Sequence, residues 1–554
     1  MNCFSGQTSC PLEQGKGFYG MFSIGEVRKP GENCRLSADL ALINANVRTM
    51  NPSQPLAQAV AVTENRIVKV GTNQDINPLI GKSTRVISLN GKTVIPGLID
   101  THIHVADFGR CLLWLDLTSA DSIRELQRLL SEKAKQTPAG KWIIGRGWNQ
   151  NRFKEKRSPT VSDLNGAAPD NPVILYHEAA MICAVNSKAL NSAGVTKQTA
   201  VPLGGGIDKN PQTGELTGIL RDTATSLIWQ VVPEPTADEL SAATALACQK
   251  LVEAGITSVH WILLSENELS IIQRLQAEEN LPTRVDVIVP YEFLKETIGF
   301  QSTDNSMLNL GGVVISTDGY LDSKTAALTQ PYSDEPSNSG AMLLTEQELA
   351  ASVGRVLSLG LQPVIHAMGD KAVDSALKVI EQNASTKGVR FRIEQAAVLN
   401  GELIKRLKAE KVVVSVQPTV IATEFGVWSA ATRLGVERAK WLHPLKTLLK
   451  EGVKVAGGSD CPMEPLNPLV GVREAVLRPS FPEQRLTVEE ALCLYTVDAA
   501  YSSGEENVKG SIEDGKVADL TILSNDPFAV QADELGDINV DTTIIDGKVV
   551  YSRH

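Results

Sequence analysis

Short apolar runs separated by turn residues occupy the two ends of the chain. Runs of this kind lie at 59–62, 66–70 and 518–523, with Asn, Gly and Pro around them. This pattern predicts short antiparallel strands. Because neither end supplies enough strands for a stable sheet of its own, we expect residues 38–96 and 501–554 to form one small β-sandwich together.

The middle of the chain, residues 97–500, alternates short buried strands with helical stretches. Apolar strands of this type lie at 255–260, 312–316, 362–366 and 453–458. Such alternation predicts a parallel sheet, and the length of the region favours an α/β fold closed into a (β/α)8 barrel of the TIM type.

An insertion interrupts the predicted barrel. One strand–helix unit takes about 30 residues, and the stretch from the first barrel strand to Gly312 is too long for the units that it must hold. We therefore expect an insertion near residues 110–250, in which Trp148 belongs either to a lid or to ordinary core. Residues 1–37 show little pattern, and we expect them to form a flexible extension.

Two histidines follow the first barrel strand. An apolar run at 93–99 predicts a buried strand, and His102 and His104 stand at its C-terminal end. Side chains alternate across a strand, so the two imidazoles point the same way. At this spacing they can chelate a divalent cation and leave other coordination positions open. The chain has only seven histidines, which makes this pair at a strand end informative.

Polar residues at other strand ends extend the candidate site. His366 and Asp460 each come at the end of a predicted barrel strand, where the active sites of such barrels lie. Together with the first two histidines they form a set of ligands that suits one zinc ion per chain, with iron or manganese as alternatives. A bound metal lowers the pKa of its water, and an aspartate beside it can take the proton. We therefore predict metal-activated hydrolysis, with catalytic roles for Asp460 and His366.

Composition and charge narrow the range of partners. The net charge of the 554 residues is −11, which argues against binding to nucleic acid or to an anionic membrane, since either needs a basic patch. No window approaches the run of about 18 apolar residues expected of a membrane helix, and the start of the chain does not resemble a secretory signal. The eight cysteines form no CxxC pair and are too sparse for a disulfide scaffold. We expect a cytoplasmic protein.

Several longer motifs occur in order along the chain. They are PGLIDTHIH at 96–104, GRGWN at 145–149, NSKAL at 186–190, DG at 318–319, TAAL at 325–328, HAMGD at 366–370 and GSDCPMEP at 458–465. Together they resemble the amidohydrolase superfamily, in particular the branch that includes N-substituted formamide deformylase. The resemblance implies a metal-binding barrel, a β-sandwich built from both chain ends, cleavage of a carbon–nitrogen bond in a small non-peptide amide, and a homodimer.

Four places depart from the pattern of that family. Val314 stands where similar proteins have a lysine whose carbamate bridges two metals, and Gln395 replaces a strand-6 histidine. Residues 179–181 are AAM where DGH is typical, and Trp261 replaces an aspartate. Valine cannot ligate a metal, and glutamine is a poor ligand for zinc. The resemblance therefore favours a mononuclear site made of the three histidines and the aspartate named above.

Two other interpretations stay open at this point. The same site could carry out deamination, or the chain could be a ligand-binding relative with a degenerate metal site and no catalysis. The retained ligands favour the enzyme, because a chain freed from metal binding has no reason to keep all four.

Four side chains are candidates for contact with the substrate: Trp148, His177, Asp318 and Gln395. The first two lie in the insertion, and Asp318 is in phase with Val314 along its strand. Asp318 is equally suited to capping the turn at Gly319.

Overall fold

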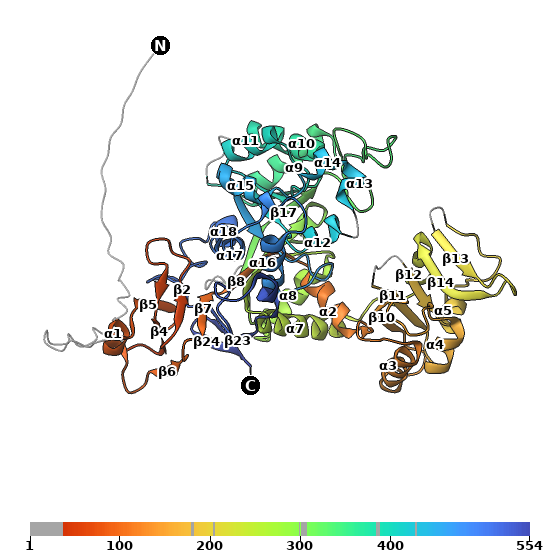
Figure 1. Cartoon of the computed structure of the whole chain (residues 1–554), viewed down its shortest axis with the longest axis horizontal. Coiled ribbons are helices and arrows are strands. Elements are labelled where there is room, and N and C mark those ends of the chain that lie inside the picture. Colours follow the sequence, from red (N-terminus) through yellow and green to blue (C-terminus); the bar gives the residue numbers. More distant parts are fainter. Residues whose placement is uncertain are drawn as a thin grey trace, which may run out of the picture.

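The computed structural model describes residues 37–178, 182–202, 205–297, 300, 307–383, 388–426 and 429–553. The predicted extension at 1–37, except for its last residue, and the departure at 179–181 lie outside the described residues. Figure 1 shows a central barrel, a β-sandwich on one side of it and a separate lobe on the opposite side.

Two sheets form the β-sandwich. Its strands are β1 (Leu40–Ile43), β2 (Asn46–Arg48), β3 (Leu56–Ala57), β4 (Ala59–Thr63), β5 (Arg66–Gly71), β6 (Arg85–Ser88), β7 (Thr93–Pro96), β22 (Leu520–Leu523), β23 (Val540–Ile545) and β24 (Lys548–Ser552), and the short helix α1 (Asn73–Ile76) follows β5. The sheet orders are β5-β4-β1-β6 and β24-β23-β22-β7-β2-β3. Because β7 pairs with β22, the second sheet joins the two ends of the chain. Leu42, Val60 and Ile522 share one buried core between the sheets. The predicted sandwich is confirmed.

Eight parallel strands form the barrel. They are β8 (Leu98–Ile103), β15 (Ile256–Ile262), β16 (Arg284–Pro290), β17 (Leu308–Ser316), β18 (Gln362–Ala367), β19 (Arg392–Gln395), β20 (Val413–Val416) and β21 (Lys454–Gly457). Neighbours in the sheet follow the order of the chain, from β8 to β21. The two edges meet where the backbone N–H of Asp460, just after β21, donates to the carbonyl of His102, 2.7 Å away. The predicted α/β barrel fold is confirmed.

The apolar run at 93–99 is not one strand, as the sequence suggested, but parts of two. Strand β7 belongs to the sandwich, and β8 begins after Gly97 and belongs to the barrel. A Cβ at Gly97 would lie 2.2 Å from Thr257 Oγ1, so the chain changes sheets at a place where only glycine fits. His102 consequently lies within β8, and His104 follows it as the residue before the next helix.

Helices follow the barrel strands and cover the outside of the sheet (Figure 1). They are α2 (Val105–Leu113), α7 (Ala237–Glu253), α8 (Asn267–Ala277), α9 (Glu346–Ser358), α10 (Asp370–Gln382), α11 (Gly401–Ala409), α12 (Val420–Phe425), α13 (Ala430–Leu434), α14 (Val436–Ala439), α15 (Leu445–Glu451), α16 (Pro468–Leu477), α17 (Val488–Leu494) and α18 (Val497–Ser502). Capping boxes fix the starts of α7, α9 and α17, each with a threonine before the helix and a glutamate three residues later. Within the described ranges, none of the helices has the length and apolar character needed to cross a membrane.

The insertion between α2 and α7 is a lobe with its own sheet. Its elements are β9 (Leu115–Asp116), α3 (Ile123–Gln136), β10 (Ile143–Trp148), α4 (Val161–Ala167), β11 (Val173–His177), β12 (Ile182–Val185), α5 (Ser187–Ser192), β13 (Gly205–Lys209), β14 (Leu216–Asp222) and α6 (Ser226–Trp229). The sheet order is β13-β14-β12-β11-β10-β9. Helices α3 and α4 pack their apolar residues, among them Leu126 and Leu164, on this sheet. The lobe therefore buries a core of its own, apart from the barrel (Figure 1).

Candidate metal centre

Two imidazoles at the end of β8 are oriented through their Nδ1 atoms. His104 Nδ1 lies 2.9 Å from the carbonyl oxygen of Ile262, and a carbonyl only accepts, so this nitrogen carries the proton. His102 Nδ1 lies 2.6 Å from Glu394 Oε2, which accepts in the same way. In the neutral form of each ring, Nε2 then has the lone pair that binds a metal.

Both Nε2 atoms face the same carboxylate oxygen. Asp460 Oδ1 lies 3.6 Å from His102 Nε2 and 3.4 Å from His104 Nε2. These distances are close to the roughly 3.3 Å that separates two ligand atoms of a tetrahedral zinc ion with bonds of 2.0–2.1 Å. The three ligand atoms converge as they would on a single cation.

The segment after β21 is fastened to the end of β8. The carboxylate of Asp100, buried below the histidines, accepts from the backbone N–H groups of His102 (3.1 Å) and Ser459 (2.9 Å). Asp460 itself has a left-handed backbone, with φ of 59°, and its N–H donates to the His102 carbonyl. These bonds fix the distance between the ligands that follow β8 and the ligand that follows β21.

Gly458 is required for this close approach. A Cβ there would lie 2.5 Å from the backbone nitrogen of His102 and 2.7 Å from its Cβ. We expect Gly458→Ala to lower the free energy of unfolding by about 1–3 kcal/mol and to weaken zinc binding, because relief requires one strand end to move. Urea unfolding and zinc titration measure the two effects.

A matched control for that substitution is Gly354→Ala in α9, where an added Cβ meets no atom within 4 Å. It should leave zinc binding unchanged and stabilise the helix by up to about 1 kcal/mol. Equal behaviour of the two variants would contradict the packing argument.

His366 faces the same site from β18. Its imidazole is buried, and neither ring nitrogen has a hydrogen-bond partner among the residues that the structure describes. Burial, reinforced by nearby His102, lowers the pKa of His366 to about 4, so the ring is neutral at neutral pH. It lies outside the tightest group of ligand atoms, but a buried imidazole with two unbound nitrogens fits the role of a metal ligand.

Asp318 supports His366 from behind. Its carboxylate accepts from the backbone N–H groups of Met368 (2.9 Å), Gly369 (2.9 Å) and Ala327 (2.8 Å), and Oδ1 is 3.8 Å from His366 Nδ1. The side chain is buried and is not part of the cavity wall. The structure thus places Asp318 after β17, where its carboxylate holds the turn that follows His366.

A cavity of about 210 Å³ opens above the ligands. Its wall on the side of β15–β17 is largely apolar and consists of Ile262, Leu263, Leu264, Pro290, Phe293 and Val314. The polar part of the wall contains the ligands together with Glu292, Ser316, Tyr320, Glu394 and Gln395. Val314, where the resemblance implied a bridging lysine, contributes an apolar surface to this wall.

The four candidates for substrate contact separate into two groups. Gln395 lines the cavity, and within the described part of the chain its buried Oε1 has no hydrogen-bond partner. Trp148 and His177 lie in the inserted lobe and are not part of the cavity wall. Trp148 is fully buried there, its indole N–H donates to the Leu175 carbonyl (2.8 Å), and the ring of His177 packs edge-on against it. The structure places Trp148 in the core of the lobe and Asp318 after β17, where it holds the turn that follows β18.

Glu394 is a residue of the centre that the sequence did not single out. Burial alone would raise the pKa of this carboxyl, but Arg392 and the hydrogen bond from His102 outweigh it and lower the pKa to about 2. Glu394 is therefore ionised, and its Oε2 points at His102 Nδ1. The alternation of β19 held a signal, since Arg392 and Glu394 occupy one face of the strand.

The electrostatics of Asp460 also favour a cation. Burial alone would raise the pKa of this carboxyl, but the imidazoles of His102 and His104 outweigh it and lower the pKa below its usual value. An ionised carboxylate and neutral imidazoles form the donor set of first-row divalent metals.

Comparison with known proteins agrees with this geometry. Residues 85–551 match the family model described as "Amidohydrolase family". The chain is 33% identical to the putative amidohydrolase YtcJ of Bacillus subtilis, over 92% of this chain and 98% of the relative. It is 28% identical to N-substituted formamide deformylase of Arthrobacter pascens, over 93% and 98% of the two chains. An uncharacterized metal-dependent hydrolase from Pyrococcus furiosus has a similar structure, with a TM-score of 0.74 and 29% identity over 88% of this chain and 99% of that one. The fold, the candidate ligands and these matches lead to one assignment: the chain belongs to the amidohydrolase family.

Proposed function

We propose that this protein hydrolyses a carbon–nitrogen bond in a small non-peptide amide, with one divalent ion, zinc in the first place, as its cofactor. The observation that carries the proposal is the convergence of His102 Nε2, His104 Nε2 and Asp460 Oδ1 within 4.8 Å of one another. His366, with two unbound ring nitrogens, completes the donor set.

We propose a single ion because the cavity wall lacks ligands for a second one. A second ion needs a bridging ligand, and the side chain in that position is Val314. Gln395 offers an amide where a second metal would need an imidazole or carboxylate. A mononuclear centre uses only the residues that are present.

A divalent ion bound there would supply Lewis acidity and lower the pKa of a water molecule. Asp460 points Oδ1 at the two histidines, which leaves its other oxygen to accept a proton and pass it to the leaving nitrogen. Neutral His366 can hold the substrate oxygen or the same ion. Gln395 can accept a hydrogen bond from a substrate N–H through its unbound Oε1.

The shape of the cavity favours an apolar substituent on the substrate. Leu264, Phe293 and Val314 form a wall that cannot satisfy a charged group, whereas the reacting amide would lie toward Asp460. The name of the Arthrobacter relative makes N-substituted formamides the first class of compounds to test. A cytoplasmic location and a homodimer remain predictions.

The experiment combines metal analysis with a substrate panel. Protein purified without added metal or chelator should contain about one zinc or similar ion per chain. It should release formate and amine from formamides with apolar N-substituents, and should act more slowly on those with charged ones. Ammonia release from amino-heterocycles, measured in parallel, tests for deamination.

Two results would contradict the proposal. Two ions per chain would mean that a residue other than Val314 bridges them. A fully loaded protein that binds these amides and releases no product would favour the ligand-binding interpretation.

A further inference from the structure

A row of buried polar side chains crosses the interior of the barrel, from the candidate metal centre to the opposite end. In order, it contains His102, Glu394, Arg392, His260, Asp286 and Lys509, and the relative exposure of each is 6% or less. The interior of such barrels is usually filled by branched apolar residues. A continuous charged row in this place requires an explanation, because a buried charge is costly unless it is paired.

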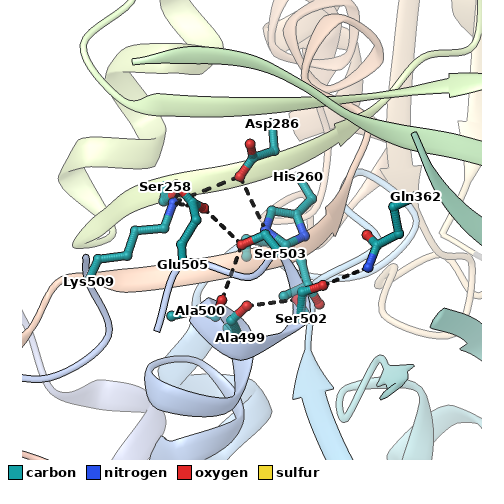
Figure 2. Close-up of polar contacts among 12 residues, drawn as sticks. Ser258, His260, Asp286, Gln362, Ala499, Ala500, Ser502, Ser503, Glu505 and Lys509 are labelled. Carbon is teal, nitrogen blue, oxygen red and sulfur yellow. Dashed lines mark hydrogen bonds and ion pairs between the residues drawn. The ribbon is translucent and has the colours of Figure 1, made fainter. Parts of the chain in front are cut away.

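The far end of this row lies next to the segment that follows α18. Figure 2 shows the ring of His260 and the ammonium group of Lys509 on either side of Asp286. His260 Nε2 is 3.6 Å and Lys509 Nζ is 3.8 Å from Asp286 Oδ2. Lys509 also contacts Glu505 (2.7 Å) and Ser258 (2.7 Å). The row is anchored at this end by an ion pair and a hydrogen bond of Lys509.

The direction of the hydrogen bonds along the row follows from its arginine, which only donates. Arg392 Nη1 lies 2.6 Å from His260 Nδ1, so that nitrogen must accept and the proton of His260 lies on Nε2, facing Asp286. On its other side Arg392 Nε forms an ion pair with Glu394 Oε1. Arg392 Nη2 also donates to the carbonyl of Thr101, next to the first metal ligand.

Glu394 therefore has one oxygen for Arg392 and the other for His102. Oε2 accepts from His102 Nδ1 at 2.6 Å. Because both oxygens are engaged, Glu394 is not available as a direct ligand of a cation. Its remaining role is to determine the tautomer and the angle of the ring that carries Nε2.

We propose that Glu394 is a positioning residue for the metal ligand His102, and that Arg392, itself held by His260, fixes Glu394 in place. This inference rests on the proposed metal site. Strand β19 then supports the candidate metal centre through Glu394, although Gln395, the last residue of the strand, is a poor metal ligand. Carboxylates that orient a metal-bound imidazole raise its basicity and fix its tautomer.

The first test is the zinc affinity of Glu394→Gln, measured by competition with a chelator. Removal of the charge should weaken zinc binding by about 10–100-fold, the usual effect of losing such a partner. The control is Asp498→Asn, which removes another buried carboxylate, paired with Lys454 at 2.7 Å and in contact with none of the candidate ligands. The control should keep the affinity of the unaltered protein, whereas equal losses would reduce Glu394 to a structural role.

A second measurement does not depend on whether that variant folds. The unaltered protein, labelled with ¹⁵N-histidine and free of metal, contains seven histidines, and the His102 signals are those missing from His102→Ala. We expect Nδ1 to keep its proton at every pH, so that Nε2 is the nitrogen that loses its proton when the ring becomes neutral. A proton on Nε2 alone, or an affinity unchanged in Glu394→Gln, would overturn the inference.

These outcomes also separate this inference from the proposed function. If zinc binds and the amides are hydrolysed while Glu394→Gln behaves as the unaltered protein, only the role of Glu394 is wrong. If no zinc binds and the His102 tautomer is as expected, the orientation of the ring stands and the metal-dependent function fails.

Discussion

Joint replacement of His102 and His104 by alanine should leave the protein without bound metal and lower amide hydrolysis by about 10³-fold or more. Loss of a single group that stabilises transition-state charge already costs about 10²–10³-fold, and this change removes two ligands at once. The change removes both nitrogen atoms that face Asp460 Oδ1. The carboxylate would then lack the two ligands that hold the ion beside it. Metal content per chain and kcat on the best amide measure the result.

The control for that experiment is His443→Ala. His443 is also buried and lies 2.6 Å from a carboxylate oxygen of Glu424, but it is not part of the cavity wall. This variant should keep its metal and most of its activity. If the double variant retained one ion per chain, the ligands proposed here would be the wrong ones.

The second large effect concerns the junction between the barrel and the sandwich. Arg284, the first residue of β16, is buried and donates through Nε to Asp519 Oδ2 (2.7 Å) and through Nη2 to Asp519 Oδ1 (3.1 Å). A further ion pair joins Arg284 to Asp546. We expect Asp519→Ala to lower the free energy of unfolding by about 3–5 kcal/mol, because the buried guanidinium loses the carboxylate that binds two of its nitrogens. Urea unfolding followed by tryptophan fluorescence measures the loss.

Two comparisons make this prediction specific. Glu437→Ala breaks the pair with Lys440, in which the glutamate side chain is 86% exposed, and should leave the free energy of unfolding nearly unchanged, because water screens exposed ion pairs. Replacing the two most buried charges, as in Arg284→Met with Asp519→Leu, should recover part of the loss, because an apolar pair can substitute for a buried ion pair and Asp546, which loses its arginine, is partly exposed. A single Asp519→Ala variant as stable as the unaltered protein would contradict the argument.

The local parts of the metal centre were predictable from the sequence. His102 and His104 are two residues apart at a strand end, and the alternation of side chains makes both Nε2 atoms face Asp460. His366 and Asp460 were placed by topology alone, since parallel barrels gather the C-terminal ends of their strands at one face. Such inferences need only the identity and order of the strands.

Other features could not be predicted, because they depend on contacts between distant segments. Glu394 is 292 positions from its partner His102, and one sequence does not show which side chains of two opposite strands meet. Trp148 follows a glycine-rich motif that suggested either a lid or core, and only the packing of the lobe separates these. The run at 93–99 divides between two sheets because Gly97 meets Thr257, a residue far along the chain.

The sequence by itself determined the strand–helix pattern, the sandwich made from both ends and the identity of the candidate ligands, because these depend on periodicity and on chemical type. Only the tertiary structure decided how the centre is supported: the row of charges behind His102, the turn that Asp318 holds under His366, and the apolar wall around Val314. Hydrogen bonds and buried ion pairs need distances and angles that arise when segments hundreds of residues apart pack together. A linear pattern contains no such distances.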